Sequence, residues 1–217
     1  LCVINVDDNS PDGTGDEADR LAAMYPGRVE ALHRPKKLGL GGAHLAGFAR
    51  ALHLGAQIVI TMDADFSHNP EDLIRLYNAT KDDGADVAIG SRYIEGVNVV
   101  NWPMGRVLMS YYASMYVRIV TGLKIMDTTA GFMCWTRKVL DTIDFDSIKF
   151  VGYAFQIEMK YTACKLGFNV VEVPIIFTDR TEGTSKMNKS IFKEAIFGIL
   201  DLRFRNIVGR IKPIKSF

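Results

Sequence analysis

Two aspartates, Asp63 and Asp65, follow a short apolar run, and their spacing suits the binding of a metal ion. Residues 58–62 are mostly apolar and β-branched, which predicts a buried strand. In an open α/β sheet, ligands bind at the carboxyl ends of the strands, and alternate positions of an extended chain point the same way. Both carboxylates could therefore hold one hard cation and, through it, a diphosphate. The alternative is a pair of solvated acids at a strand end.

Four basic side chains elsewhere in the chain suit an anionic ligand. A guanidinium group forms paired hydrogen bonds with phosphate oxygens better than any other side chain. An isolated exposed arginine is usually a solvated surface charge, so position alone does not assign these residues a role. The four are Arg92, Arg106, Arg180 and Lys186.

Strands that alternate with helices predict an α/β fold with a mostly parallel sheet and crossover connections. The predicted strands are residues 1–6, 28–33, 58–62, 86–90, 129–136 and 168–177. The predicted helices are residues 15–24, 43–54, 104–120, 137–143, 155–166 and 190–210, with one more that begins near Pro70. Residues 36–42 are expected to form a flexible basic loop, and residues 155–166 a helix with one apolar face. Pro174 predicts that its strand is an edge strand or a bulged one.

The bulk composition is that of a globular domain and excludes several classes of protein. The chain has 217 residues, 48% of them apolar and 24% charged, and a net charge of +1, so no global field points to nucleic acid. Cys2, Cys134 and Cys164 are scattered and lack metal-ligand spacing, which favours a reducing compartment over a disulfide framework. No run of 18 or more apolar residues is present, so no membrane-spanning helix is expected.

Six segments, taken in order, resemble the family 2 glycosyltransferases of the GT-A fold. More narrowly, they are similar to the dolichol-phosphate (polyprenol-phosphate) mannosyltransferases. Each segment alone is a weak or moderate signal, but the ordered set spans nearly the whole chain. The segments are 6–14 (VDDNSPDGT), 37–41 (KLGLG), 62–68 (MDADFSH), 90–93 (GSRY), 152–159 (GYAFQIEM) and 173–186, from Val-Pro-Ile through Asp-Arg to Ser-Lys.

The resemblance implies a nucleotide-sugar site. By position, Val6 and Asp8 would hold the nucleotide base, and an Asx turn is the alternative for Asp8. The acidic triplet Asp63, Ala64 and Asp65 would contact the nucleotide sugar. Its two carboxylates would coordinate Mg²⁺ or Mn²⁺ to neutralise the diphosphate leaving group.

The resemblance also implies a third metal position and a set of phosphate contacts. Ser67 stands where some relatives carry an amide ligand to the metal, and water could fill that place here. Arg92 and Arg106 would bind phosphate and, with Asp65, act in catalysis. Arg180 and Lys186 would belong to a mobile loop over the donor.

Three other residues in or near these motifs are expected to have other roles. His68 is expected to be an ordinary loop histidine, and Trp102 a packing residue. Glu158 is considered as part of the lining of the sugar pocket.

The activity implied by the resemblance is transfer of mannose from GDP-mannose to a polyprenyl phosphate, with inversion at the anomeric carbon and with a metal ion. One alternative is transfer of glucose or another sugar to the same lipid, or to a carbohydrate acceptor. No Gln-x-x-Arg-Trp segment is present, which argues against a processive polysaccharide synthase. A second alternative is a non-catalytic, nucleotide-binding partner subunit.

The expected domain organisation is a catalytic domain followed by a basic tail. Residues 1–189 would form a GT-A domain whose first strand is missing from this chain, and residues 190–217 an amphipathic helix and tail. From residue 186 onward there are eight basic and two acidic residues, a net charge of +6. This pattern suits a helix at an anionic membrane surface, although a helix packed on its own domain fits the first half of the stretch equally well. The expected location is the cytoplasmic face of a membrane, with or without a membrane-anchoring partner subunit.

Overall fold

The structure is a computed structural model that describes residues 1–36, 39–179, 189–207 and 213. The chain divides into two compact units, Leu1–Ala56 and Gln57–Phe217.

The first unit contains two strands and two helices. Strands β1 (Val3–Asp7) and β2 (Val29–His33) pair in parallel as a two-stranded sheet. Helix α1 (Thr14–Met24) connects them and helix α2 (Leu40–His53) follows, in the predicted order and with boundaries within two residues of the prediction, except at the start of α2. Helix α2 begins three residues before the predicted start, inside the expected flexible loop. The reason is Gly39, whose φ of 88° turns the chain so that the helix can begin at the next residue.

The second unit is built on a four-stranded sheet with the strand order β3-β6-β4-β7. Its strands are β3 (Ile58–Thr61), β4 (Val87–Ser91), β6 (Met133–Thr136) and β7 (Val170–Pro174). Strand β6 runs antiparallel to β3 and β4, whereas β4 and β7 are parallel. Among the described strands β7 lies at the edge of the sheet and ends at Pro174, in agreement with the prediction for this proline.

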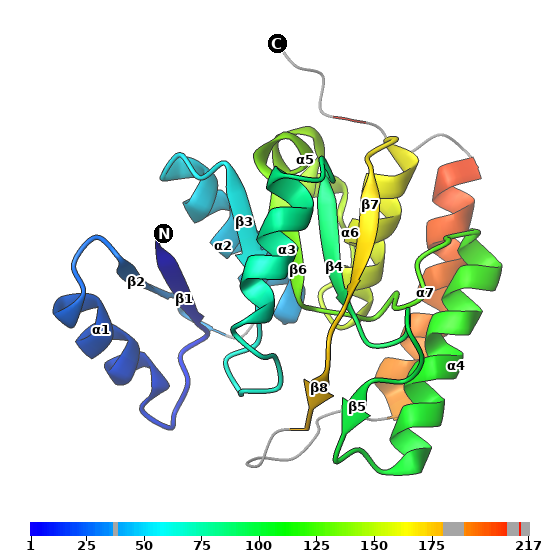
Figure 1. The fold of residues 1–217 in the computed structure, drawn as a ribbon, viewed down its shortest axis with the longest axis horizontal. Coiled ribbons are helices and arrows are strands. Elements are labelled where there is room, and N and C mark those ends of the chain that lie inside the picture. Colours follow the sequence, from blue (N-terminus) through cyan, green and yellow to red (C-terminus); the bar gives the residue numbers. More distant parts are fainter. Residues whose placement is uncertain (37–38, 180–188, 208–212, 214–217) are drawn as a thin grey trace. The chain divides into compact units, whose positions relative to one another are not determined.

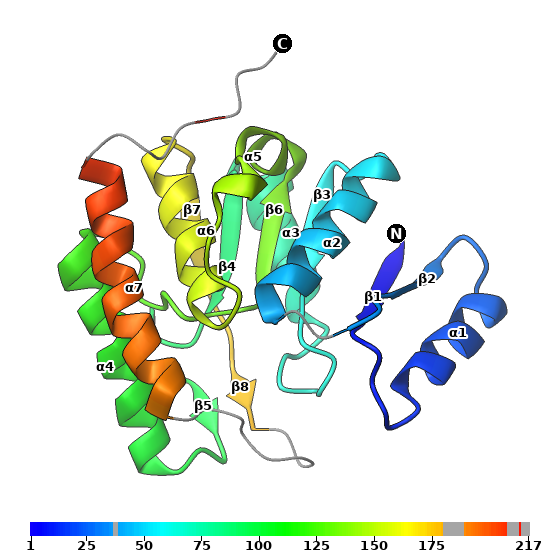
Figure 2. The same ribbon diagram turned by 180° about the vertical axis from the view of Figure 1, so that it is seen from behind.

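Helices cover both faces of this sheet (Figures 1 and 2). Helix α3 (Asp72–Lys81) packs on one face over a core that includes Leu76, Phe132 and Ile175. Helix α6 (Ala154–Lys165) covers the opposite face. The prediction that α6 has a single apolar face is wrong, because residues 154–163 are all buried, the charged ones included. Charged side chains at these positions find ionic or hydrogen-bonding partners inside the unit, as shown below.

Three predicted segments of the second half differ in detail. The strand expected at 129–136 begins only at Met133, because the residues before it form a turn with buried charge partners. The strand expected at 168–177 is divided into β7 and the short strand β8 (Phe177–Thr178). Strand β8 pairs with β5 (Val99–Val100), which lies in a segment that was expected to be a loop. Helix α5 (Arg137–Thr142) and a short 3₁₀ turn (Phe145–Ser147) precede α6.

The two long helices α4 (Met104–Thr121) and α7 (Lys189–Ile207) pack against each other and lie beside the sheet (Figure 1). Helix α7 also contacts α6, and its residues Ile199, Leu202 and Arg205 are buried. Gly198 allows α7 to lie close to the segment before α6, because a Cβ atom there would overlap the ring of Phe150. None of the helices in the described part of the chain is both long enough and apolar enough to cross a membrane.

Candidate active site

The predicted metal and phosphate residues of the second unit meet at one edge of its sheet. Since β3 and β4 are both antiparallel to β6, and β7 is parallel to β4, these three strands end at the same edge (Figure 1). Asp63 follows β3, Arg92 follows β4, and Asp179 follows β8, which continues from β7. Strand β6 runs in the opposite direction and therefore begins at this edge. The topology therefore places these side chains where α/β sheets bind ligands.

The acidic loop after β3 presents its carboxylates to solvent. Asp63 is exposed and Asp65 is partly buried. An Oδ1 atom of Asp65 accepts a hydrogen bond from the backbone N–H of Ser67 at 3.1 Å, which bends the loop. Phe66, between them, has a φ of 60° and a side chain that is 88% exposed. A positive φ is costly for a bulky residue, and such strain concentrates at functional sites.

His68 is buried beneath this loop and holds its backbone, so it is not the ordinary loop histidine that the sequence suggested. It is buried, with its ring 4.8 Å from that of Phe132 and 5.2 Å from that of Phe177. Its Nδ1 atom accepts the backbone N–H of Asp63 at 3.3 Å. Burial lowers the pKa of His68, and the nearby carboxylates of Asp63 and Asp65 oppose this effect. A neutral ring that accepts at Nδ1 therefore fixes the backbone of the first acidic residue.

The two carboxylates fit a divalent cation that shares its coordination with a substrate. Mg²⁺ is usually held by one or two carboxylates, together with water and substrate phosphates. Asp63 and Asp65 supply such a pair at an accessible strand end. Ser67 is only 3% exposed, so its role as a third ligand stays a prediction. In the part of the chain that the structure describes, no group of three or more histidine, cysteine or acidic side chains suits a metal ion.

Arg92 is held by a buried carboxylate. Its Nε and Nη2 atoms donate to the two oxygens of Asp127, each at 2.7 Å, and Nη2 also donates to the hydroxyl of Thr129 at 2.8 Å. Asp127 is completely buried. Burial alone would raise its pKa, but the charge and hydrogen bonds of Arg92 outweigh burial and lower it. The Nη1 atom of Arg92 makes no hydrogen bond among the described residues, so this atom remains for a ligand.

The segment that carries Asp127 is fixed by two further charged side chains, one buried and one partly buried. Lys160 donates from Nζ to the carbonyl oxygens of Thr128 and Ala130, at 2.9 and 2.6 Å. From the other side, the carboxylate of Glu172 accepts the backbone N–H of Asp127 and of the preceding residue, at 2.9 and 2.7 Å. Burial lowers the pKa of Lys160 to about 7, although Asp127 acts in the opposite direction. The loop that holds Arg92 is thus bonded on both sides.

Arg106 lies in the first turn of α4, beside an indole ring that Arg92 also approaches. The ring centroid of Trp102 is 4.2 Å from the guanidinium carbon of Arg106 and 5.3 Å from that of Arg92. The Nη1 atom of Arg106 donates to both carboxylate oxygens of Asp179, at 2.8 and 2.9 Å. The side chain of Arg106 is 28% exposed, whereas that of Arg92 is 10% exposed. The two predicted phosphate ligands are therefore neighbours of one aromatic ring, and Arg106 is the more accessible.

The predicted nucleotide residues lie partly in the first unit. Val6 belongs to β1, and Asp8 follows that strand. The carboxylate of Asp8 accepts a hydrogen bond from Nη1 of Arg34 at 2.7 Å, and both side chains are largely buried. Ala64, in the second unit, is exposed. A role of Val6, Asp8 and Ala64 in binding a nucleotide sugar stays a prediction.

Sequence reasoning missed three residues of this site and placed two that the structure does not describe. Asp127 and Asp179 were not singled out, and Trp102 was assigned to packing alone. The only local signal for Asp179 is that it precedes Arg180 in one of the motifs. Arg180 and Lys186 lie outside the described residues.

Glu158 does not line a pocket, in contrast to the role considered for it. It is 1% exposed, and its carboxylate accepts the backbone N–H groups of Lys149 and Phe150, each at 2.9 Å. It also accepts a hydrogen bond from Nη2 of Arg205 on α7 at 2.7 Å. The carboxylate therefore joins α6 to α7 and to the segment between α5 and α6.

Comparisons with known proteins identify relatives over nearly the whole chain. A family model described as glycosyl transferase family 2 matches residues 2–144. The polyprenol monophosphomannose synthase of Mycolicibacterium smegmatis is 47% identical over 212 residues, which are 98% of this chain and 80% of the relative. The undecaprenyl-phosphate mannosyltransferase of Micrococcus luteus is 47% identical over 91% of this chain and 80% of its own. The dolichol-phosphate mannosyltransferase of Pyrococcus furiosus is 37% identical over 88% of this chain and 52% of its own.

The fold is similar to that of a solved glycosyltransferase. The crystal structure of glucosyl-3-phosphoglycerate synthase from Mycobacterium tuberculosis, in complex with Mn²⁺, UDP-glucose and phosphoglyceric acid, superposes with a TM-score of 0.64. The two chains are 17% identical, and the match covers 92% of this chain and 67% of that one. This similarity confirms the predicted α/β, GT-A-like fold.

Proposed function

Because the chain belongs to glycosyl transferase family 2, we propose that this enzyme transfers mannose from GDP-mannose to a polyprenyl phosphate, with inversion and with a divalent metal ion. The names of the three relatives support a polyprenyl phosphate acceptor and mannose as the sugar. The observation that carries the proposal is the convergence of two accessible carboxylates and two arginines at one sheet edge. A carboxylate pair suits a metal diphosphate, and the arginines suit a second phosphate.

The donor would bind at the acidic loop. Asp63 and Asp65 are the carboxylates that would hold Mg²⁺ or Mn²⁺, and such an ion stabilises a diphosphate as a leaving group. His68 fixes the backbone of Asp63, so that this carboxylate is positioned before the donor arrives. Val6 and Asp8 would contact the base, and Ala64 would lie along the nucleotide sugar. Arg180 and Lys186 would add positive charge over the donor phosphates.

The acceptor phosphate would bind at Arg106, with Arg92 behind it. One phosphate oxygen attacks the anomeric carbon from the face opposite the diphosphate, and a new C–O bond forms as the bond to the diphosphate breaks. The electron pair of the broken bond leaves with GDP, and attack from the opposite face inverts the configuration of the anomeric carbon. A phosphate monoester has a second pKa near 6 and is mostly a dianion at neutral pH, so its oxygen needs no general base. The chain's contribution is to position the phosphate and to neutralise its charge.

A donor panel with the full-length protein tests this proposal against its alternatives. We expect mannosyl transfer with GDP-mannose, polyprenyl phosphate and Mn²⁺, and little with UDP-glucose. Preference for UDP-glucose on the same lipid would support the glucosyltransferase alternative. Binding of GDP without turnover in any donor and acceptor pair would favour a non-catalytic partner subunit.

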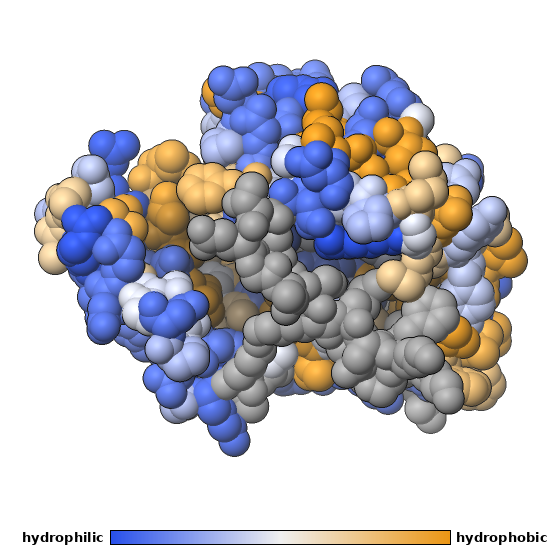
Figure 3. All heavy atoms as spheres, turned by 90° about the horizontal axis from the view of Figure 1, so that it is seen from below, coloured by the Kyte–Doolittle hydropathy of each residue, from blue (hydrophilic) through white to orange (hydrophobic). Residues whose placement is uncertain are grey.

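A membrane surface is the proposed place of action, and two packed helices support it. Eleven large hydrophobic side chains of α4 and α7 are exposed, at 36–74% of their full area. They are Met104, Leu108, Met109, Tyr111, Tyr112, Met115, Ile119, Phe197, Leu200, Phe204 and Ile207. Figure 3 views the side on which β5 and β8 lie, and hydrophobic residues reach the surface at its right-hand edge, where α4 and α7 run. Exposed apolar surface of this extent marks an interaction site.

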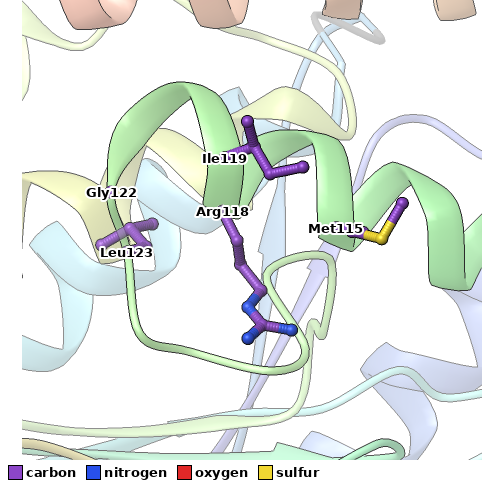
Figure 4. A pocket seen from close by; sticks show the side chains of 5 residues that line it. All are labelled: Met115, Arg118, Ile119, Gly122 and Leu123. Carbon is purple, nitrogen blue, oxygen red and sulfur yellow. The ribbon is translucent and has the colours of Figure 1, made fainter.

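A shallow pocket at the far end of α4 belongs to this apolar surface rather than to the active site. It has a volume of about 380 Å³ and is lined by Met115, Arg118, Ile119, Gly122 and Leu123 (Figure 4). Arg118 is twelve residues beyond Arg106 on the same helix, which is about 18 Å at 1.5 Å per residue. One guanidinium among apolar side chains suits the boundary between acyl chains and anionic headgroups.

Flotation with anionic liposomes tests the membrane role. Substitutions Ile119→Asn and Phe197→Asn each place a polar group on the exposed faces of α4 and α7 and should reduce flotation of the full-length protein. Ile74→Asn on α3 is the matched control, because Ile74 is 66% exposed but lies on another helix. Equal flotation of all three variants would exclude this surface. Flotation that requires a second protein would point to a membrane-anchoring partner subunit.

A further inference from the structure

The contact between Arg106 and Asp179 uses only one nitrogen of the guanidinium group. Both oxygens of Asp179 accept from the same atom, Nη1, at 2.8 and 2.9 Å. The Nε and Nη2 atoms, which form the fork that suits phosphate, make no hydrogen bond within the described residues. Asp179 therefore holds the guanidinium and leaves its phosphate-binding edge open.

Three further contacts fix the place of this pair. The indole ring of Trp102 lies 4.2 Å from the guanidinium carbon of Arg106, which restricts the plane of the group. The backbone N–H of Asp179 donates to the carbonyl oxygen of Val100 at 3.0 Å, and that of Thr178 donates to the carbonyl oxygen of Ser67 at 3.1 Å. The carboxylate is thus anchored to β5 and, through β8, to the acidic loop. The pair links the proposed acceptor site to the loop that would hold the donor metal.

We propose that Asp179 is a positioning residue for the acceptor phosphate, because it holds Arg106 so that Nε and Nη2 face the ligand. This inference rests on the proposed function, which places the acceptor phosphate at Arg106. Its functional consequence is tighter acceptor binding, with no change in the binding of the nucleotide.

Two opposing effects decide whether Asp179 strengthens or weakens binding of the acceptor phosphate. A free arginine side chain loses rotamer freedom when it binds, and prior ordering can be worth up to about thirtyfold in affinity. The negative charge of Asp179 repels a phosphate dianion, but at about 6–7 Å in water and physiological salt this repulsion amounts to roughly threefold. Ordering is the larger effect, although Trp102 would supply part of it without Asp179. The expected net benefit of Asp179 is about fivefold in affinity.

Binding of hexyl phosphate, a short phosphate monoester, tests the proposal without turnover. With the full-length protein, Asp179→Asn should raise the dissociation constant of hexyl phosphate about fivefold and leave that of GDP with Mn²⁺ within about twofold. Asp82→Asn is the matched control, because this exposed residue follows α3 and takes no part in the site. The same loss should appear as a raised KM for the acceptor with an unchanged KM for the donor.

A double-mutant cycle separates positioning from a general structural effect. In an Arg106→Ala background, Asp179→Asn should change hexyl phosphate binding by less than about twofold, because the group that it positions is gone. Tighter binding in the single variant would show instead that Asp179 competes with phosphate, and would overturn the proposal. A fivefold loss that persists without Arg106 would overturn it as well. Absence of hexyl phosphate binding to the parent protein would remove the proposed function, and the positioning role with it.

Discussion

Replacement of Asp127 by asparagine should destabilise the second unit by about 3 kcal/mol. Arg92 is buried, and its Nε and Nη2 atoms have the two oxygens of Asp127 as partners. An asparagine presents an N–H₂ group to one of these donors and removes the compensating charge. Loss of one partner of a buried ion pair costs about 3–5 kcal/mol, and the remaining oxygen of the amide places the expected value near the lower end.

Urea unfolding measures this cost directly. Both tryptophans of the chain, Trp102 and Trp135, belong to the second unit, so their fluorescence reports the unfolding of that unit. Asp141→Asn is the matched control, because Asp141 pairs with Arg137 on the surface of α5, where an ion pair is worth less than about 1 kcal/mol.

The opposite result would change the assignment of Arg92. A loss below about 1 kcal/mol for Asp127→Asn, equal to that of the control, would mean that Arg92 does not depend on Asp127 for its charge balance. The guanidinium would then be free to bind phosphate with its full fork. A loss of the expected size leaves Arg92 with Nη1 alone for a ligand.

The other predictions concern the metal site, the docking of α7, a buried lysine and the protonation of the acceptor. Asp65→Asn should reduce turnover at least about hundredfold, because it removes a charged oxygen from the metal; near-normal activity of this variant in chelator would contradict the assignment. Gly198→Ala should lower the free energy of unfolding by about 1–3 kcal/mol, because the new methyl group would overlap the ring of Phe150, and unchanged urea unfolding would argue against the observed packing of α7. Burial lowers the pKa of Lys160 to about 7, so between pH 7 and 10 the unfolded chain binds more protons than the folded one. The free energy of unfolding should therefore rise with pH in this window, by up to about 1.4 kcal/mol per pH unit. Lys160→Met should remove this slope. The acid limb of the rate profile should follow the ionisation of the acceptor and shift with a phosphonate of different pKa; a limb that stays fixed with such acceptors and vanishes in a single histidine or carboxylate variant would reveal an enzymic base.

The sequence predicted the alternation of strands and helices because that information is local. Buried strands such as residues 58–61 are short β-branched runs, and helix boundaries follow from caps, prolines and glycines within a few residues. The acidic loop could be placed for the same reason, since a carboxylate that follows such a strand must lie at the edge of the sheet. One prediction about a helix was wrong, because tertiary contacts override the local pattern. Helix α6 was expected to be amphipathic, yet Glu158 and Lys160 are buried with partners from other elements.

The partners of the two arginines were beyond sequence reasoning, because no local pattern connects them. Asp127 is 35 residues from Arg92, and Asp179 is 73 residues from Arg106. The topology brings each pair together, since β6 is inserted between β3 and β4, and β8 carries the chain back past β5. A prediction from residue types counts every guanidinium as a potential phosphate ligand, whereas the structure shows which hydrogen-bond donors are already used.

The hydrogen-bond donors that remain unused show which of the two arginines is better suited to bind phosphate. Counted over the described residues, Arg92 has Nε and Nη2 bonded to buried oxygens and retains Nη1, whereas Arg106 has Nη1 bonded and retains the Nε and Nη2 edge. A phosphate that binds through two parallel N–H bonds requires two adjacent nitrogens on one edge. Arg106 offers that edge and is the more exposed of the two. If both arginines bind the acceptor phosphate, Arg106 should therefore contribute the bidentate contact and Arg92 a single hydrogen bond. Arg106→Lys should then weaken the binding of hexyl phosphate, because lysine keeps the charge but lacks the two adjacent nitrogens.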